Sequence, residues 1–255
     1  MRLILIRHGD PDYVNDTLTE RGRIEAKLLA DWLATKRIDK IYVSPKGRAQ
    51  ATASYTLEKT GMTAETLPWL REFWAKSRIW EDPELEAAMP YESERQKTAG
   101  RPIWDILPAY LDDKPDYFHP EDWRNTEVCA HGNMVEIYHE VTTEFDKLLA
   151  AHGYVRAGRN YRVERGNSDT LVFFCHAGIG CVLLSHLLSI SPFAMLQGFT
   201  CLPTGMTVVN TEERRKGIAS FHVERFGDLS HLALGGQEPS FMGRFCERFE
   251  DDTLH

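Results

Sequence analysis

Short apolar runs alternate with longer amphipathic segments along most of this chain. The short runs are rich in β-branched and aromatic side chains, which is typical of buried strands. We expect strands at residues 3–6, 41–43, 65–67, 171–175, 206–210 and 218–224. Apolar positions at helical spacing predict helices between them. We expect helices at residues 19–36, after Ser44-Pro45, at 133–151 and at about 178–188. Strands that alternate with helices predict an α/β fold, in which helices cover both faces of a sheet.

Two of these helices have a recognisable start. Thr19 is a good residue to cap the first helix. The apolar stripe expected along this helix comprises Ile24, Leu28, Leu29, Trp32 and Leu33. Ser44-Pro45 has the order of a cap followed by a proline in the first turn, so the second helix is expected to open there, directly after a strand.

Residues 73–130 interrupt the alternation. These 58 residues hold 6 of the 12 prolines and 4 of the 6 tryptophans, Trp74, Trp80, Trp104 and Trp123. They are too rich in aromatic residues for a disordered linker. We therefore expect a single domain over residues 1–255 with a cap inserted at about 73–130. The tryptophans would either form the core of this cap or offer a platform for an aromatic or sugar group. Arg78, Arg95 and Arg101 are candidates to contact an anionic group of a ligand, in addition to any anionic group bound elsewhere in the chain.

The overall charge changes the list of plausible partners. The formal net charge is −8, and the 13 acidic and 7 basic residues of segment 73–130 account for most of it. This is the wrong sign for a protein that binds nucleic acid or an anionic membrane through clustered Lys and Arg. Residues 170–211 contain no Asp, Glu, Lys or Arg, but glycines, histidines, serines and a proline interrupt the run. A buried strand and helix fit this run better than a membrane span.

Five cysteines, an odd number without CxxC spacing, argue against a disulfide framework or a zinc cluster. The apolar run before Arg7 is too short for a secretion signal. Reduced thiols and the absence of such a signal favour a soluble, cytoplasmic protein.

Two predicted strands end in histidine, as Arg7-His8-Gly9 and as His176-Ala177-Gly178. Ligands of open α/β sheets bind beyond the carboxyl ends of the strands. His176 also precedes a helix N-terminus, whose free N–H groups favour an anion. Arg48, in the first turns of the second helix, follows a strand as well and is expected to face the same end. Two histidines and two arginines predict a pocket for a dianionic phosphoryl group, because guanidinium forks grip its oxygens.

The ordered set of motifs resembles the histidine phosphatase superfamily, also called phosphoglycerate-mutase-like. The set comprises Arg7-His8-Gly9, Leu18-Thr19-x-x-Gly22, Ser44-Pro45-x-x-Arg48-Ala49-x-x-Thr52-Ala53, Leu70-x-Glu72, His176-Ala177-Gly178 and the segment from Phe226 to Leu232. The resemblance covers about residues 1–72 and 133–232. It implies a three-layer α/β fold with a mainly parallel sheet, one reversed strand and an inserted cap subdomain.

The resemblance also implies roles for individual residues. His8 would be the nucleophile that takes the phosphoryl group as phosphohistidine. Arg7, Arg48 and His176 would hold the phosphate oxygens as catalytic and substrate-binding groups, and Glu72 would donate a proton to the leaving group. The arginines supply the positive charge, so no metal and no cofactor are expected. The implied reaction is hydrolysis of a small phosphorylated metabolite.

Two departures from the family pattern concern the substrate side of this site. Tyr13-Val14 stands where relatives frequently place Trp-Asn, and Asn15 follows one step later, which leaves the asparagine contact with phosphate open. After Glu72 the chain reads Phe73-Trp74, so substrate specificity does not carry over.

Other functions remain open at this stage. One alternative is a phosphoglycerate mutase-type phosphotransferase, and another is an inactive relative that binds a phospho-ligand or a protein. A cysteine-dependent phosphatase built on Cys175 is rejected, because such a loop needs Arg where this chain has Cys181. The sequence does not define the oligomeric state.

Overall fold

A computed structural model describes residues 1–89 and 100–246 of the chain. Arg95, one of the three candidate arginines of segment 73–130, therefore lies outside the described residues. Within them, eight strands form one sheet in the order β5-β4-β10-β1-β11-β12-β9-β8. These strands are β1 (Arg2–Arg7), β4 (Lys40–Val43), β5 (Ala64–Thr66), β8 (Tyr154–Ala157), β9 (Asn160–Val163), β10 (Thr170–Cys175), β11 (Met206–Arg215) and β12 (Ile218–Asp228).

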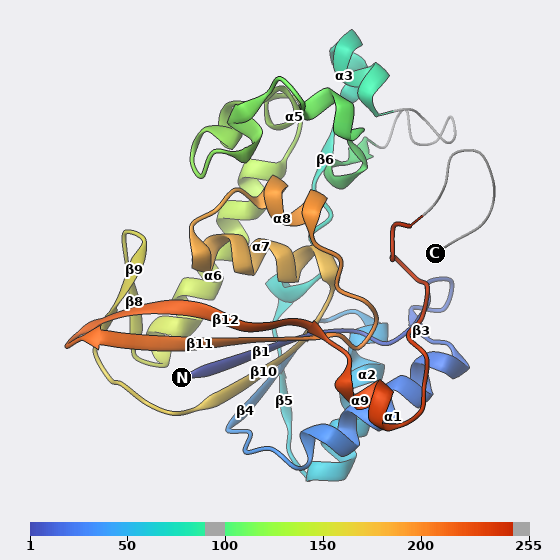
Figure 1. Ribbon diagram of the computed structural model, residues 1–255, viewed down its shortest axis with the longest axis vertical. Coiled ribbons are helices and arrows are strands. Elements are labelled where there is room, and N and C mark those ends of the chain that lie inside the picture. The colour runs from blue at the N-terminus through green and yellow to red at the C-terminus, as the bar shows by residue number, and fades with distance from the viewer. Residues whose placement is uncertain (90–99, 247–255) are drawn as a thin grey trace.

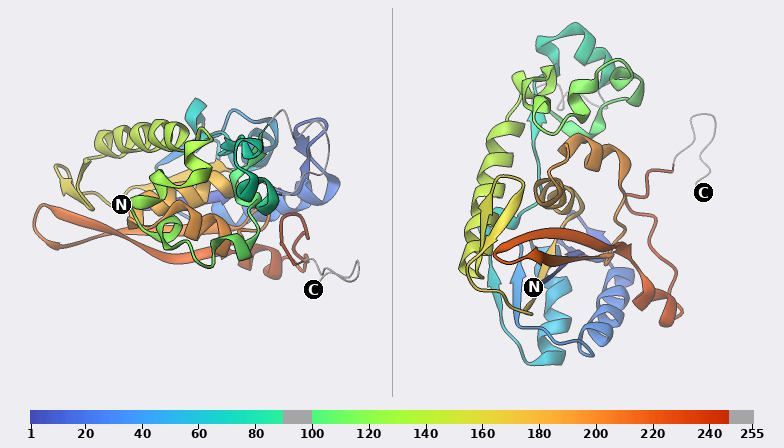
Figure 2. Two further views of the ribbon diagram at one scale, coloured as in Figure 1. Left: turned by 90° about the horizontal axis from the view of Figure 1, so that it is seen from above. Right: turned by 60° about the vertical axis from the view of Figure 1, so that its left-hand side comes forward.

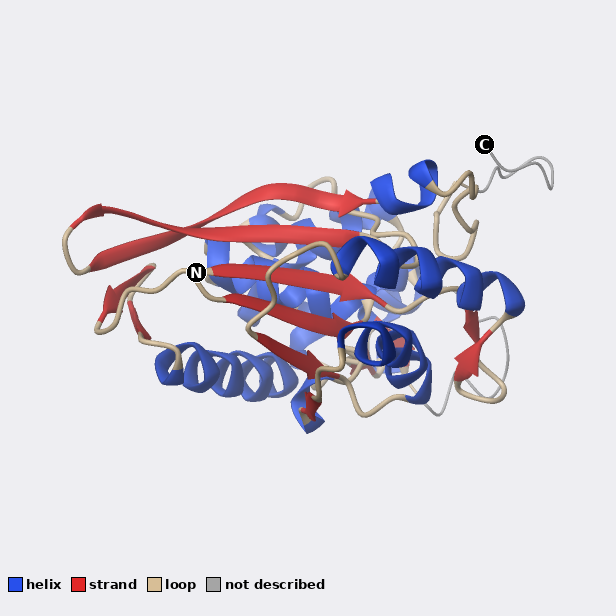
Figure 3. Cartoon of the chain, turned by 90° about the horizontal axis from the view of Figure 1, so that it is seen from below, coloured by secondary structure: helices blue, strands red, loops and turns tan. Residues whose placement is uncertain are grey.

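Helices cover both faces of this sheet, which makes a three-layer α/β fold (Figure 1). The upper layer in Figure 1 contains α6 (Met134–Ala151), α7 (Ala177–Leu188) and α8 (Pro192–Gly198). The lower layer contains α1 (Glu20–Leu33), α2 (Gly47–Thr60) and α9 (Ser230–Leu234). Figure 3 shows the sheet from below, with the helices of this lower layer in front of it. The sequence prediction of the fold class is confirmed.

The sheet has a hydrophobic core on each of its two faces. Successive side chains of the central strands pack alternately in these two cores, because side chains alternate between the faces of a strand. Leu3 and Leu5 of β1 pack in the core beneath α6 and α7. Ile4 and Ile6 pack in the core beside α1 and α2. Burial on both faces explains why these strands are continuous apolar runs.

The directions of the strands differ from the expectation of a single reversed strand. The strands β5, β4, β10 and β1 are parallel neighbours, whereas β11, β12, β9 and β8 each pair antiparallel. Two strands, β11 and β9, therefore run against the others. The β8–β9 hairpin, which was not among the predicted strands, extends the sheet beyond β12 and adds the second reversal.

Two expectations about helices were partly wrong. Thr19 caps α1 as predicted, because its side chain accepts a hydrogen bond from Gly22 N. However, Ile24 is 41% exposed, since α1 turns Glu25, Ala26 and Leu29 inward instead. Ser44-Pro45 does not open α2, which begins at Gly47 with Lys46 as its cap.

Most of segment 73–130 gathers at one end of α6, beyond α7 and α8 (Figures 1 and 2). It consists of short elements: α3 (Pro83–Ala88), α5 (Glu127–Ala130), the paired strands β6 (Lys76–Ser77) and β7 (Arg101–Pro102), and several 3-10 turns between Ile79 and Asn125. Trp123 is fully buried against Tyr138 of α6, with ring centroids 4.9 Å apart. Trp74 is 53% exposed. Trp123 therefore belongs to the core of this segment, whereas Trp74 does not.

No helix among residues 1–89 and 100–246 is long and apolar enough to cross a membrane. The apolar stretch from Thr170 onward forms the buried strand β10 and helix α7, as expected.

Candidate active site

The two strand-end histidines lie side by side at the carboxyl edge of the sheet. The parallel register pairs Arg7 of β1 with Cys175 of β10, so His8 and His176 leave the sheet at the same level. Their ring centroids are 5.1 Å apart, and each residue is only 1% exposed. Because neither ring has much contact with water, burial favours the neutral form of both.

One ring nitrogen of His8 is fixed as a proton donor. Nδ1 lies 2.7 Å from the carbonyl oxygen of Gly9, and a carbonyl can only accept, so Nδ1 carries the hydrogen. Burial, and next the charge of Arg7, lower the pKa of His8 to about 3. His8 is therefore neutral near pH 7, and its Nε2 keeps an unprotonated lone pair. That state is the one that a nucleophile requires.

His176 is oriented by Ser44, a contact that the sequence analysis did not foresee. The hydroxyl of Ser44 lies 2.8 Å from Nε2 of His176 and also accepts the N–H of Lys46 at 3.2 Å. The hydroxyl oxygen has two lone pairs, so while it accepts from Lys46 N it can either donate to Nε2 or accept from it. Nδ1 has no hydrogen-bond partner among the described residues. Burial lowers the pKa of His176 well below its usual value, so the ring is neutral near pH 7.

Arg7 and Arg48 each donate a hydrogen bond to the protein through one guanidinium nitrogen. Nη1 of Arg7 donates to the carbonyl of Cys201 at 2.7 Å, and Nη1 of Arg48 donates to Asp16 at 2.7 Å. In both side chains Nε is buried without a hydrogen-bond partner in the described part of the chain. A buried donor without a partner is costly, and an anion that accepts from it removes that cost.

Glu72 lies in the turn after Trp69 and Leu70, against the start of α7. Its Oε1 accepts from its neighbour Phe73 N at 2.9 Å and from Ile179 N at 3.0 Å. Burial raises the pKa of this carboxyl above its usual value, although these two hydrogen bonds act in the opposite direction. A carboxyl that holds its proton more tightly than usual is suited to act as an acid.

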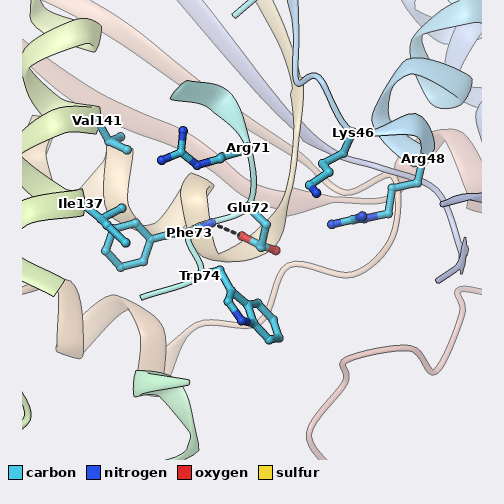
Figure 4. A pocket seen from close by; sticks show the side chains of 8 residues that line it. All are labelled: Lys46, Arg48, Arg71, Glu72, Phe73, Trp74, Ile137 and Val141. Atoms are coloured by element: carbon cyan, nitrogen blue, oxygen red, sulfur yellow. Dashed lines mark hydrogen bonds between the residues drawn. The ribbon is translucent and has the colours of Figure 1, made fainter. Parts of the chain in front are cut away.

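Two cavities meet at Glu72. A cavity of about 370 Å³ is lined by Lys46, Arg48, Arg71, Glu72, Phe73, Trp74, Ile137 and Val141. Figure 4 shows Lys46 and Arg48 reaching toward the carboxylate of Glu72 while Arg71 points away, toward α6. A larger cavity of about 850 Å³ is lined by Arg7, Arg48 and Glu72 on the side of the sheet and by Lys76, Arg101 and Trp104 of segment 73–130.

The predicted residues therefore come together. Arg7, Arg48 and Glu72 line the larger cavity, and the buried His8 and His176 directly adjoin Arg7 and Ala177 of its lining. Arg101 also lines this cavity, is 4% exposed and pairs with Asp105 at 2.9 Å. Arg78 does not line it and pairs with Glu81 instead. Asn15 is exposed, and its side-chain amide donates to Asp12 at 2.7 Å rather than facing the site.

The loop before β11 supplies residues that sequence reasoning missed. Thr204 N donates to the carbonyls of both Arg7 and His8, and Thr204 Oγ1 lies 3.0 Å from Nε2 of His231. Thr204 has a φ of 56°, which is an uncommon conformation for a β-branched residue. No residue pattern in this loop signalled the contact.

Two further histidines lie outside this site beside carboxylates, and four of the five cysteines are buried. His131 lies 3.0 Å from Glu81, and His186 lies 2.9 Å from Asp146. The five cysteines are free thiols, and burial raises the pKa of Cys175 well above its usual value. A thiol in this state is a poor nucleophile, which agrees with rejecting the cysteine mechanism.

A neutral histidine with a free Nε2, two guanidinium groups and a carboxyl with a raised pKa lie at the carboxyl edge of a mostly parallel sheet. This set of groups is suited to an enzyme that handles phosphoryl groups. Comparisons with known proteins agree. The sequence model of the histidine phosphatase superfamily (branch 1) matches residues 3–108. Over these residues the chain is similar to the histidine phosphatase superfamily, and its curated relatives are named as phosphatases.

Individual relatives cover nearly the whole chain. It is 22% identical to "Probable phosphatase C1687.21" of Schizosaccharomyces pombe over 246 residues, which is 91% of this chain and 95% of that protein. It is 25% identical to "Phosphoserine phosphatase 1" of Hydrogenobacter thermophilus over 252 residues, 92% of this chain and 100% of that protein. The solved structure of a mycobacterial glucosyl-3-phosphoglycerate phosphatase is similar with a TM-score of 0.58 and 20% identity, over 89% of this chain and 98% of that one. This last likeness shows the fold.

Proposed function

We propose that this protein hydrolyses phosphomonoesters of small metabolites through a phosphohistidine formed on Nε2 of His8. The observation that carries the proposal is the hydrogen bond from Nδ1 of His8 to the Gly9 carbonyl. This bond fixes the tautomer and leaves Nε2 as the attacking atom. The Nε groups of Arg7 and Arg48, buried without partners among the described residues, are matched to the oxygens of a bound phosphoryl group.

In the first step, Nε2 of His8 forms a bond to phosphorus while the bond from phosphorus to the alcohol oxygen breaks. Glu72 gives its proton to that oxygen as the alcohol leaves. In the second step, the Glu72 carboxylate takes a proton from water, the water oxygen bonds to phosphorus and the N–P bond breaks. Inorganic phosphate leaves, and His8 and Glu72 return to their starting states. Arg7, Arg48 and His176 stabilise the charge on the phosphoryl oxygens, so the proposed mechanism uses no metal or cofactor.

The substrate class rests on the relatives. Phosphoserine and glucosyl-3-phosphoglycerate, which appear in the names of two of them, are small phosphorylated metabolites. We further propose that residues 1–255 act as one domain whose segment 73–130 serves as the cap over the site. Lys76, Arg101 and Trp104 of this segment line the larger cavity, opposite Arg7 and Arg48.

The decisive experiment traps the covalent intermediate. The protein is mixed with ³²P-labelled 4-nitrophenyl phosphate and quenched in alkali, in which phosphohistidine survives. We expect label on the peptide that contains His8 and none in His8→Ala, while His131→Ala, the matched control outside the site, is labelled like the wild type. Turnover by His8→Ala at the wild-type rate, or label on another residue, would overturn the proposal.

The same preparation separates hydrolysis from mutase activity. We expect 3-phosphoglycerate, when it is consumed, to yield inorganic phosphate. Transfer of phosphate between positions of phosphoglycerate without net release would contradict the hydrolase assignment and support the mutase alternative.

A further inference from the structure

The larger cavity gathers apolar side chains that a folded protein normally keeps from water. The described residues expose thirteen large apolar side chains, and five of these line this one cavity. The five are Tyr13, Trp74, Phe199, Met242 and Phe245. They come from four distant parts of the chain, and scattered exposure would not place them together. A concentration of this kind is typical of a binding surface.

The position of the aromatic residues relative to Glu72 shows which part of a substrate they would contact. Trp74 and Trp104 form an edge-to-face pair with ring centroids 5.1 Å apart. Trp104 lies close to the first turn of α7, where a Cβ on Gly178 would meet both its ring at 3.6 Å and Oε1 of Glu72 at 2.8 Å. In Figure 4 the indole of Trp74 lies beside the carboxylate of Glu72, on the side away from Arg71.

The proton donor of the proposed mechanism must lie next to the oxygen of the leaving alcohol. The Trp74–Trp104 pair lies near the same carboxylate and is therefore within reach of the carbon skeleton of that alcohol. Trp74 is 53% exposed and Phe199 47%, so a flat apolar group that covers them removes apolar surface from water.

We propose that the cavity selects phosphomonoesters whose alcohol carries a flat apolar group, such as an aromatic ring, which packs on Trp74 and Trp104. This inference rests on the proposed function, because the phosphoryl site and Glu72 set the orientation of the ester. It goes beyond the compact polar substrates named for the relatives, since phosphoserine offers no such group to these rings.

The test compares two esters that differ in this group alone. Ethyl phosphate and 2-phenylethyl phosphate are both esters of primary alcohols, so their intrinsic reactivities are similar. We expect kcat/KM to favour the phenylethyl ester by about tenfold or more, mainly through KM. In Trp74→Ala this ratio is expected to fall close to one. Trp80→Ala is the matched control, because Trp80 is an exposed tryptophan of the same segment that does not line the cavity, and it should keep the wild-type ratio.

A binding measurement tests the proposed aromatic subsite without requiring catalysis. 3-Phenylpropylphosphonate and propylphosphonate cannot be hydrolysed, and calorimetry gives their dissociation constants directly. We expect the phenyl compound to bind about tenfold more tightly to the wild type, and this difference to shrink in Trp74→Ala and in Phe199→Ser. Equal binding of the two phosphonates, or an unchanged ratio in both variants, would overturn the subsite. Failure to release phosphate from either ester, with the binding preference intact, would instead refute the proposed function.

Discussion

Glu72 and Gly178 are in such close contact that no side chain fits between them. A Cβ at position 178 would lie 2.8 Å from Oε1 of Glu72 and 3.5 Å from its Cδ. The same carboxylate accepts from Ile179 N, one residue further along α7. The glycine thus lets the start of the helix hold the carboxyl that we assign as the proton donor.

Gly178→Ala is therefore expected to displace the carboxyl of Glu72. We predict that kcat for an alkyl phosphate falls by about tenfold or more, and by less for 4-nitrophenyl phosphate, whose leaving group needs little protonation. Gly180→Ala is the matched control. A Cβ there meets nothing within 4 Å, and alanine is the better helix former, so its kinetics should match the wild type. Equal kinetics of both variants would contradict the assigned contact.

Glu72→Gln removes the proton while it keeps the size of the side chain. We expect kcat for alkyl phosphates to fall by roughly 10²-fold or more, and the loss for 4-nitrophenyl phosphate to be smaller. In the wild type, the proton must be present for the first step. Because the pKa of Glu72 is raised, alkyl phosphate turnover should stay high through the acidic range and decline as the pH rises through that pKa. The decline should be absent in Glu72→Gln. A pH–rate profile of each protein checks this, and identical profiles would exclude Glu72 as the acid.

The protonation state of His8 can be measured directly. Burial and Arg7 lower its pKa to about 3, so the ring should remain neutral from pH 8 down to about pH 4. NMR of ¹³C-labelled histidine follows this state, and His8→Asn identifies the signal by its loss. A titration midpoint near 6.5 would show that the ring is not desolvated as described.

Glu25, which has no role in the proposed reaction, makes the stability of the folded protein depend on pH. It is fully buried in α1, its Oε2 accepts from Asp10 N at 2.8 Å, and burial raises its pKa to about 7. The folded protein thus holds this proton more tightly than the unfolded chain does. Its contribution to stability is complete below about pH 4.5 and is lost as the pH rises through 7.

Replacing Glu25 with Gln should remove this dependence. We predict that between pH 5 and pH 8.5 the free energy of unfolding falls by up to about 3 kcal/mol more in the wild type than in Glu25→Gln. Urea denaturation of both proteins at the two pH values measures these free energies of unfolding. Glu58→Gln, on the exposed face of α2, provides the comparison and should retain the wild-type fall. A parallel pH dependence in Glu25→Gln would argue against the buried proton.

What the sequence predicted well depended on local pattern. The strands β1 and β10 are continuous apolar runs that end in histidine, so their pattern indicated both the buried sheet and the edge at which the histidines meet. Thr19 was recognisable as a cap because its partner, Gly22 N, is three residues away. In each of these cases the determining contacts lie within a few residues or follow from the strand repeat.

What the sequence did not predict depended on contacts between distant segments. Ser44 has the pattern of a helix cap, but it orients His176, which lies 132 residues further along the chain. Ile24 fits a helical stripe, yet the helix turns Ala26 inward because that face packs against α2. Trp74 and Trp123 have the same residue type and opposite surroundings, since Trp123 packs against Tyr138 of α6 and Phe193 of α8 while Trp74 is half exposed.

The pairing of Arg7 with Cys175 in the sheet has a consequence for how this protein can change over evolution. Backbone hydrogen bonds in the core, rather than the loops that follow, set the spacing of His8 and His176. Removing one residue from β1 alone would retract His8 by about 3.3 Å and turn the side chains that follow toward the opposite core. The lengths of β1 and β10 are therefore tied to each other, and insertions that leave the two histidines in place are confined to segments outside these strands.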